Sequence, residues 1–389
     1  MKNIYMDHQA AMPVDERVMK FASRFLTGNF MNPSSQYSLG LEARGAVEAA
    51  RENIASLINA ETSKNIIFTG SATEASNLAI RGAAYRNADK IGRKVVATEI
   101  EHMSVLNPIK ELSKNGFETV LVPVDKYGIV DLEKLKEAVT EGTVLTSVML
   151  ANNEIGTIEP VREISEIVHA AGSLLHVDAV AAAGRIPIDV QVDGIDLLTL
   201  SSNDLYGPRG AGALYVRKGV KLQSVMPGGG QEKGLRSGSE DVFAIAGMGE
   251  AARIAAEEMV DESARLMKIR DGLIAGLLKI EQTYLTGHPV NRLPHHVGVR
   301  FTAIEGEGIL LWLDKAGIQV STGSACSSQT LQASHVLLAT GLQHEDVHGS
   351  VVMTLGHSSS ADDIDYVVKT VTDTVDRLRQ MSPVWSGRK

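Results

Sequence analysis

The sequence predicts an α/β protein with a doubly wound, mainly parallel sheet and a smaller α+β domain. Short apolar segments alternate with amphipathic segments from residue 65 to residue 216, which is typical of parallel βαβ units. The alternation stops at a glycine-rich loop, residues 227–239, that is too long for a simple connection. The 389 residues can form two hydrophobic cores. We expect a large domain at residues 15–257 and a small domain composed of residues 1–14 and 258–389.

Each predicted element follows from its local pattern. After an extended lead-in at residues 3–14, helices are expected where apolar residues recur at helical spacing, at residues 15–27, 41–58, 72–85, 103–115, 131–139 and 161–171. Strands are expected at short apolar runs, at residues 65–68, 94–98, 118–124, 144–150, 174–177, 195–200 and 213–216. Beyond the loop we expect a long helical segment at 242–279 that contains the hinge, strands at 297–301 and 351–355, and helices at 308–315 and 361–381.

Composition narrows the class of protein. The formal net charge is −9, and this acidic balance argues against a nucleic-acid binder, which usually has a basic face. The N-terminus reaches Asp7 before any long apolar run, so we expect no signal peptide. No uncharged run has the length of a membrane span. The single cysteine, Cys326, excludes an internal disulfide framework and favours a reducing, cytoplasmic setting.

Two segments carry side chains suited to binding a phosphorylated cofactor. Gly70 to Glu74 lies between a predicted strand and a predicted helix, where backbone N–H groups and hydroxyls can bind a phosphate. The same segment also reads as an ordinary capping box. Asp178 ends a strand, so its carboxylate either caps a loop or faces a ligand at the edge of the sheet.

Several segments together resemble one known family. Residues 323–328 read Gly-Ser-Ala-Cys-Ser-Ser, and residues 152–156 read Asn-Asn-Glu-Ile-Gly. Asp178 lies in His-Val-Asp-Ala, and a Gly-Pro turn follows at 207–208. In these motifs, and across nearly its whole length, the chain resembles the class V aminotransferases and most closely the cysteine desulfurases. The resemblance implies the fold type I of transferases that depend on pyridoxal 5′-phosphate, and a homodimer.

The resemblance also implies roles for individual residues. Asp178 would hold the pyridine nitrogen of the coenzyme protonated, and His102 would stack on its ring and act in catalysis. Asn153 would face the ring oxygen or the substrate, and Ser239 would reach the phosphate of the neighbouring subunit. The other residues implied to lie at the coenzyme are Ala72, Thr73, Ser201 and Asn203. Cys326 would be the nucleophile, on a polar loop that lets a thiol take up sulfur and pass it on.

Four positions depart from the family pattern, and all four belong to the active site. Asp204 occupies the place of the lysine that forms the Schiff base, and a carboxylate cannot form one. Asn203 stands for a histidine, and Ala181 for a glutamine that faces the ring oxygen. His357 stands where an arginine clamps the substrate carboxylate. Lys233, in the glycine-rich loop, is a candidate substitute amine.

These departures leave three hypotheses open. The first is a desulfurase-type protein of iron–sulfur cluster assembly, in which Cys326 carries persulfide sulfur or ligates a 2Fe–2S cluster shared with a scaffold protein, and any pyridoxal phosphate binds noncovalently. The second is a non-catalytic docking homologue. The third is a zinc hydrolase, because His344, Glu345 and His348 spell the H-E-x-x-H signature. That chemistry needs a stable helix and a third ligand, and Gly349 leaves room for barely one turn.

Overall fold

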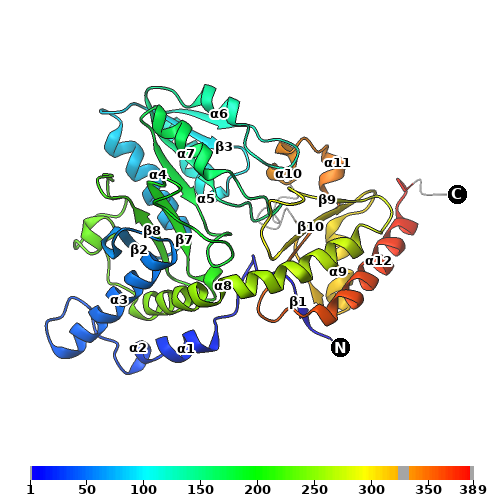
Figure 1. The fold of residues 1–389 in the computed structure, drawn as a ribbon, viewed down its shortest axis with the longest axis horizontal. Helices are drawn as coiled ribbons and strands as arrows, with labels where there is room; N and C mark the ends of the chain where they lie inside the picture. Colours follow the sequence, from blue (N-terminus) through cyan, green and yellow to red (C-terminus); the bar gives the residue numbers. More distant parts are fainter. Residues whose placement is uncertain (1, 323–332, 386–389) are drawn as a thin grey trace.

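A computed structural model describes residues 2–322 and 333–385 of the chain (Figure 1). Among these residues a seven-stranded sheet has the order β2-β8-β7-β6-β5-β3-β4. Its strands are β2 (Ile66–Thr69), β3 (Lys94–Thr98), β4 (Glu118–Val122), β5 (Thr143–Met149), β6 (Leu174–Asp178), β7 (Leu197–Ser201) and β8 (Gly212–Val216). The pairs from β4 to β7 are parallel, whereas β8 runs antiparallel to both of its neighbours. The mainly parallel sheet predicted from the sequence is therefore confirmed.

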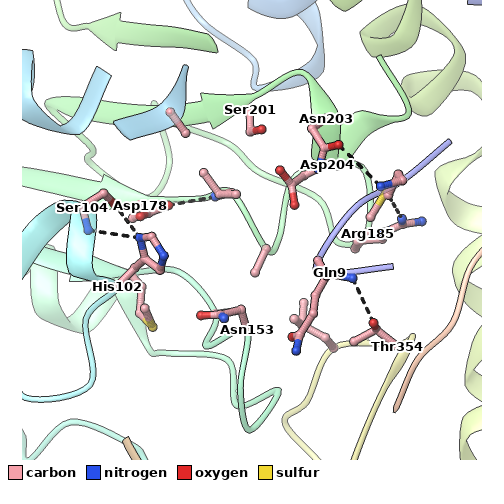
Figure 2. A pocket seen from close by; sticks show the side chains of 18 of the residues that line it. Gln9, His102, Ser104, Asn153, Asp178, Arg185, Ser201, Asn203, Asp204 and Thr354 are labelled. Carbon is pink, nitrogen blue, oxygen red and sulfur yellow. Dashed lines mark hydrogen bonds between the residues drawn. The ribbon is translucent and has the colours of Figure 1, made fainter. Parts of the chain in front are cut away.

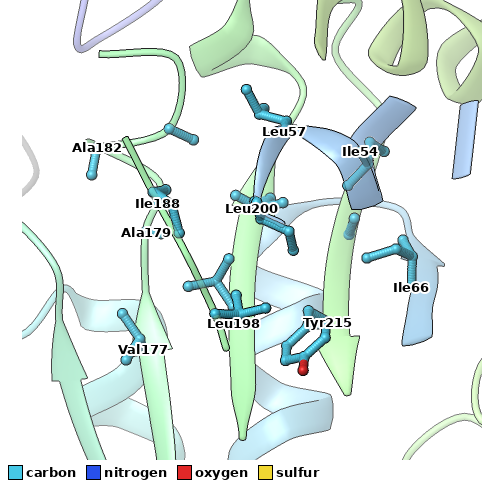
Figure 3. Close-up of a cluster of buried hydrophobic side chains, with 14 of the residues drawn as sticks. Ile54, Leu57, Ile66, Val177, Ala179, Ala182, Ile188, Leu198, Leu200 and Tyr215 are labelled. Carbon is cyan, nitrogen blue, oxygen red and sulfur yellow. The ribbon is translucent and has the colours of Figure 1, made fainter. Parts of the chain in front are cut away.

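Helices cover both faces of this sheet. The helices of this part of the chain are α1 (Glu16–Ala22), α2 (Arg24–Thr27), α3 (Ser38–Leu57), α4 (Ala72–Asn87), α5 (Met103–Lys114), α6 (Leu132–Ala138), α7 (Val161–Ala170) and α8 (Val242–Leu277). Because successive strand side chains point to opposite faces, Leu198 and Leu200 pack with α3, α7 and α8, and Leu197 packs with α4 and α5. Figure 3 shows the first of these clusters, in which Tyr215 lies beside the strand leucines.

A smaller antiparallel sheet lies beside the central one (Figure 1). Its order is β12-β10-β9, with β9 (Thr283–Leu285), β10 (His296–Phe301) and β12 (Ser350–Thr354). Near it, β1 (Ile4–Tyr5) pairs in parallel with β11 (Ile318–Gln319). The remaining helices are α9 (Gly306–Lys315), α10 (His335–Ala339), α11 (His344–Val347) and α12 (Ile364–Met381).

One helix, α8, connects the two cores. Its first half, from Val242 to Ile254, packs in the cluster around the central sheet, and Leu266 to Leu277 pack in the cluster around the small sheet. The boundary expected near residue 257 lies inside this continuous helix. The division into two domains stays a prediction, because one helix serves both cores.

The predicted elements differ from the observed ones mainly at their ends, but β9, β11, α10 and α11 have no counterpart among the predicted elements. The helix expected at residues 15–27 is two helices that meet at Ser23. The helix expected from residue 361 begins with a 3₁₀ turn, Ala361–Asp363. The expected cap at Asp131 is confirmed, because its carboxylate accepts a hydrogen bond from the Lys134 N–H at 3.0 Å. None of the described helices is both long enough and apolar enough to span a membrane.

Candidate active site

A cavity of ≈ 320 Å³ lies at the carboxyl ends of the parallel strands, the usual ligand site of an open α/β sheet. Figure 2 shows side chains from both sheets and from the N-terminal segment around it. The polar side chains that line the cavity are Gln9, Ser71, Thr73, His102, Ser104, Asn153, Asp178, Arg185, Ser201, Asn203, Asp204, His295, His296 and Thr354. Ala72 also lines it, so one cavity brings together these predicted site residues: Ala72, Thr73, His102, Asn153, Asp178, Ser201 and Asn203.

The N-terminus of α4 forms one wall of the cavity. Ser71 caps this helix, because its hydroxyl accepts a hydrogen bond from the Glu74 N–H at 3.2 Å. The Glu74 carboxylate in turn accepts one from the Gly70 N–H at 2.8 Å. Residue 212 is a glycine because a Cβ there would lie 2.4 Å from the Ser71 carbonyl carbon. The segment therefore is a capping motif, and it also turns the free N–H groups of a first helical turn toward the cavity.

Asp178 and His102 lie together on the opposite side of the cavity from Arg185 (Figure 2). Asp178 is the last residue of β6, and burial raises the pKa of its carboxyl, while the nearby His102 acts in the opposite direction. The Nδ1 of His102 accepts a hydrogen bond from the Ser104 N–H at 3.1 Å. A neutral His102 therefore carries its proton on Nε2. This arrangement fixes the orientation of the ring at the start of α5.

Two buried residues that hold the site together were not predicted from the sequence. Glu101 is fully buried, and its carboxylate accepts hydrogen bonds from the Thr98 hydroxyl at 2.6 Å and the Met149 N–H at 2.8 Å. It thereby joins the ends of β3 and β5 just before His102. The Nε2 of His296 pairs with the Asn153 carbonyl at 3.0 Å, which ties the small sheet to the Asn153 loop. Nothing in the sequence distinguishes this glutamate and this histidine from others. Their burial in the structure is what shows that they support the site.

Asp204 lies on a one-turn 3₁₀ segment, Asn203–Leu205, directly after β7. Burial raises the pKa of its carboxyl from 3.8 to about 6, whereas the side chains of Ser201 and Asn203 and the charge of Arg185 act in the opposite direction. The turn ends at Tyr206, which has a left-handed backbone with φ of 62°. This strained turn directs the Asp204 side chain into the cavity, at the position that the resemblance gives to a lysine.

Arg185, and not His357, is the cation that faces this cavity. His357 stacks on Tyr206, with ring centroids 3.9 Å apart, and lines a separate small cavity behind Asp204. Ala181 lines the main cavity as the resemblance implies. Arg185 follows a turn at Gly184, whose φ of 70° favours glycine, and its side chain is 4% exposed. Nothing in the sequence distinguishes Arg185 except its place after Asp178.

Two of the predicted residues, Ser239 and Lys233, line other hollows of the described chain. Ser239 lines a different surface hollow of the described chain, and its role at a neighbouring subunit stays a prediction. The prediction of Lys233 as a substitute amine is wrong for this cavity, because Lys233 lies in another hollow and its Nζ donates a hydrogen bond to the Lys64 carbonyl. The buried ion pair of Glu232 with Arg51, at 2.8 Å, holds its loop there. Cys326 lies outside the described residues.

The H-E-x-x-H segment forms only one turn of helix. His344 begins α11, which ends at Val347, and the rings of His344 and His348 have centroids 6.5 Å apart. His348 instead faces Glu305 at 3.8 Å. Within residues 2–322 and 333–385, no group of three His, Cys, Asp or Glu side chains is placed to hold a metal ion. The described geometry gives the zinc hypothesis no third ligand.

The cavity keeps the groups that suit the phosphate and the pyridine nitrogen of pyridoxal phosphate, but not the amine that would tether it. The first turn of α4, with the hydroxyls of Thr73 and Ser201, suits a phosphate, and Asp178 suits a protonated pyridine nitrogen. When bound, the coenzyme supplies an electron sink for a substrate carbanion. No lysine is among the described residues that line the cavity, and Asp204 occupies the place of the amine. These residues therefore suit a noncovalently held coenzyme.

The raised pKa of Asp204 predicts a gain in stability when its charge is removed. Because its pKa is higher in the folded protein than its ordinary value of 3.8, ionisation opposes folding above about pH 6 and has no effect below about pH 4. We expect Asp204→Asn to raise the free energy of unfolding by about 1–2 kcal/mol near pH 8, allowing for water in the cavity. Urea unfolding near pH 8 and pH 4.5 measures this.

The exposed Asp89, whose side chain is 94% accessible, provides the matched control. Asp89→Asn is expected to leave the free energy of unfolding within about 0.5 kcal/mol at both pH values. A gain for Asp204→Asn that is equally large at both pH values would contradict this account, since only an ionisation can make the gain depend on pH.

Comparison with known proteins identifies the family. The family described as aminotransferase class-V matches residues 4–367. The chain is 54% identical over 381 residues to cysteine desulfurase IscS 1 of Archaeoglobus fulgidus, covering 98% of this chain and 99% of that protein. It is 46% identical to cysteine desulfurase IscS of Methanosarcina thermophila, with 98% and 94% covered.

Among solved structures, a NifS-like protein superposes with a TM-score of 0.90 at 34% identity, covering 97% of this chain and 100% of that one. The likeness extends over both sheets and over the cavity between them, so it is not confined to a common sheet architecture. Fold type I, predicted from the resemblance, is confirmed. On its sequence, its fold and the residues of its cavity, this chain belongs to the class V aminotransferase family, among the cysteine desulfurases.

Proposed function

We propose that this chain is a desulfurase-type protein of iron–sulfur cluster assembly whose working group is the Cys326 thiolate. In this proposal Cys326 carries persulfide sulfur or ligates a 2Fe–2S cluster jointly with a scaffold protein, since thiolates are the usual ligands of such clusters. The main support for this proposal is the set of residues that line the cavity. Phosphate-binding and ring-binding groups line it, and a carboxylate, Asp204, stands where the covalent tether of the coenzyme is expected.

The described residues on either side of the Cys326 segment support this role. Ser321 pairs with Val352 of the small sheet, and its N–H donates to the Val352 carbonyl at 3.0 Å. On the other side, Ser334 caps α10, and the Nε2 of His335 pairs with the Glu101 carbonyl at 3.0 Å. Glu101 directly precedes His102 of the cavity. The described residues that follow the Cys326 segment therefore contact the chain beside the site.

A homodimer is part of the proposal. Ser239 lines a surface hollow with Phe25, Leu26 and Phe30, away from the cavity of its own chain. Large apolar side chains are exposed around this part of the chain: Leu26 is 55% and Phe30 63% accessible. A second copy that covers this apolar surface would bury it and could bring Ser239 to the neighbouring site.

The alternative is a docking homologue in which no residue of the cavity or of the Cys326 segment acts chemically. The missing amine favours it, because the described cavity lining cannot tether the coenzyme. It differs from the main proposal in one testable respect, since it requires nothing of the Cys326 thiol.

The absence of a lysine from the described cavity lining predicts how the purified protein behaves with its coenzyme. We expect the protein to lack the yellow absorbance of covalently held pyridoxal phosphate, because Asp204 cannot form that bond. The measurement is a visible spectrum before and after dialysis, with mass spectrometry after borohydride reduction. Absorbance that survives dialysis, with coenzyme fixed to a lysine, would overturn the assignment.

Restoring the amine is expected to restore part of coenzyme binding. Asp204→Lys places an amine next to the retained phosphate site and Asp178, so we expect coenzyme to remain after dialysis and to become borohydride-reducible on residue 204. Asp204→Asn is the matched control, because it removes the charge without adding an amine. If the two variants retain equal amounts of coenzyme, the other departures dominate and the site has lost more than its tether.

The role of Cys326 is tested in cluster assembly. We expect Cys326→Ala to abolish the visible absorbance of a cluster formed when the protein, a scaffold protein, iron and sulfide are mixed anaerobically, because a ligand is lost. Co-elution in gel filtration shows separately whether docking persists. Ser334→Ala, which removes a helix cap but no thiol, is the control. Unchanged cluster formation by Cys326→Ala would favour the docking alternative.

A further inference from the structure

Arg185 carries a buried charge that has no partner in the described chain. Arg185 is 4% exposed and lines both this cavity and the small cavity behind it, where, against the effect of burial and together with the Arg265 side chain, its charge lowers the pKa of Glu262 without forming an ion pair. Among the described residues it forms no ion pair, and its Nε makes no hydrogen bond. Within the described chain the guanidinium has one hydrogen bond, from Nη2 to the Met12 sulfur at 3.2 Å, and it lies 5.1 Å from the Tyr206 ring centroid. A guanidinium cannot lose its proton in a protein, so this charge is fixed.

A desolvated and unpaired cation opposes folding unless something else compensates it. Arg185 is nevertheless held firmly in place. Its N–H donates to the Ala182 carbonyl at 3.0 Å, and its own carbonyl accepts from the Ser263 hydroxyl on α8 at 2.6 Å. A firmly held cation without a protein partner is the arrangement expected where an anionic ligand supplies the missing charge.

A second charge of opposite sign faces the same cavity. Asp204 and Arg185 are near enough to influence each other electrostatically, yet they form no ion pair. Both lie on the side of the cavity that is away from His102 and Asp178 (Figure 2). The carboxylate of a ligand can therefore bind Arg185 while an ammonium group of the same ligand binds Asp204. Small α-amino acids carry both groups on one carbon atom.

We propose that Arg185 and Asp204 form a noncovalent site for a free α-amino acid, in which Arg185 binds the α-carboxylate and Asp204 binds the α-ammonium group. This assigns the carboxylate to a cation outside the family's usual clamp position, which His357 occupies, and gives Asp204 a role of its own. The inference deepens the proposed function of the same cavity, and rests on it only for the choice of cysteine as the probe.

Nearby uncharged groups fit the same ligand. The buried Oε1 of Gln9 and the buried Nδ1 of His295 have no hydrogen-bond partner among the described residues. Burial, assisted by the charge of Arg185, lowers the pKa of His295 well below its ordinary value, so that ring stays neutral. These two groups add hydrogen bonds without adding charge. A phosphate dianion suits this side of the cavity less well, because the Asp204 carboxylate would repel it.

The test compares three ligands by isothermal titration calorimetry on the full chain at neutral pH, without oxygen. L-cysteine carries both charged groups, cysteamine lacks the carboxylate, and 3-mercaptopropionate lacks the ammonium group. We expect cysteine to bind roughly 10- to 100-fold more tightly than either of the others, the range typical of one lost charge-assisted contact. Equal affinities for the three ligands would overturn the proposal.

Variants assign each contact to its residue. We expect Arg185→Gln to weaken the binding of cysteine by roughly 10- to 100-fold and to leave the binding of cysteamine unchanged. Asp204→Asn is expected to weaken the binding of cysteine. The binding of 3-mercaptopropionate is expected not to become weaker. Arg253→Gln, an exposed arginine paired with Glu250, is the control and is expected to change neither. If Arg185→Gln weakens cysteine and cysteamine equally, Arg185 does not bind the carboxylate.

Thermal unfolding without ligand separates this role from a structural one. Removing an unpaired buried charge is expected to leave the melting temperature of Arg185→Gln equal to or above that of the unchanged protein. A lower melting temperature together with unchanged cysteine binding would mean that Arg185 serves only the fold. Cluster formation at Cys326 is scored separately, so failure of amino-acid binding with intact cluster formation overturns this inference and leaves the proposed function standing.

Discussion

Desolvation of ionisable groups at the carboxyl edge of the central sheet is the constraint on which the site depends. The small sheet covers this edge, because α8 extends through both cores and His296 of β10 contacts the Asn153 carbonyl. The covered edge holds Asp178, Asp204 and Arg185 in one cavity. Burial there raises the pKa of both carboxyls, and it leaves Arg185 without a described partner.

The phosphate side of the cavity is formed by contacts that do not involve residue 204. The helix cap at Ser71, the close approach of Gly212 and the strand end at Ser201 are contacts of backbone and small side chains. They determine where a phosphate could bind whatever occupies position 204. The group at position 204 bears on whether a coenzyme can be tethered, and it is not part of these contacts, so the fold does not depend on it.

The turn that ends at Tyr206 brings Asp204 and Arg185 to the same cavity. The left-handed backbone of Tyr206 closes the 3₁₀ turn that carries Asp204. Its hydroxyl accepts a hydrogen bond from the His357 N–H at 3.0 Å, and its ring lies against Arg185 on one side and His357 on the other. His357 is thereby held in the cavity behind Asp204, and Arg185 lines the main cavity.

The sequence by itself determined the order of strands and helices, the placement of Asp178, Ser201 and Asp204 at strand ends, and the family. These follow from local periodicity and from motifs that are contiguous in the chain. Only the tertiary structure decided that Arg185 faces the cavity, that Glu101 is buried and that Lys233 lies elsewhere. Burial and charge pairing depend on residues far apart in sequence, and periodicity carries no information about which of them meet.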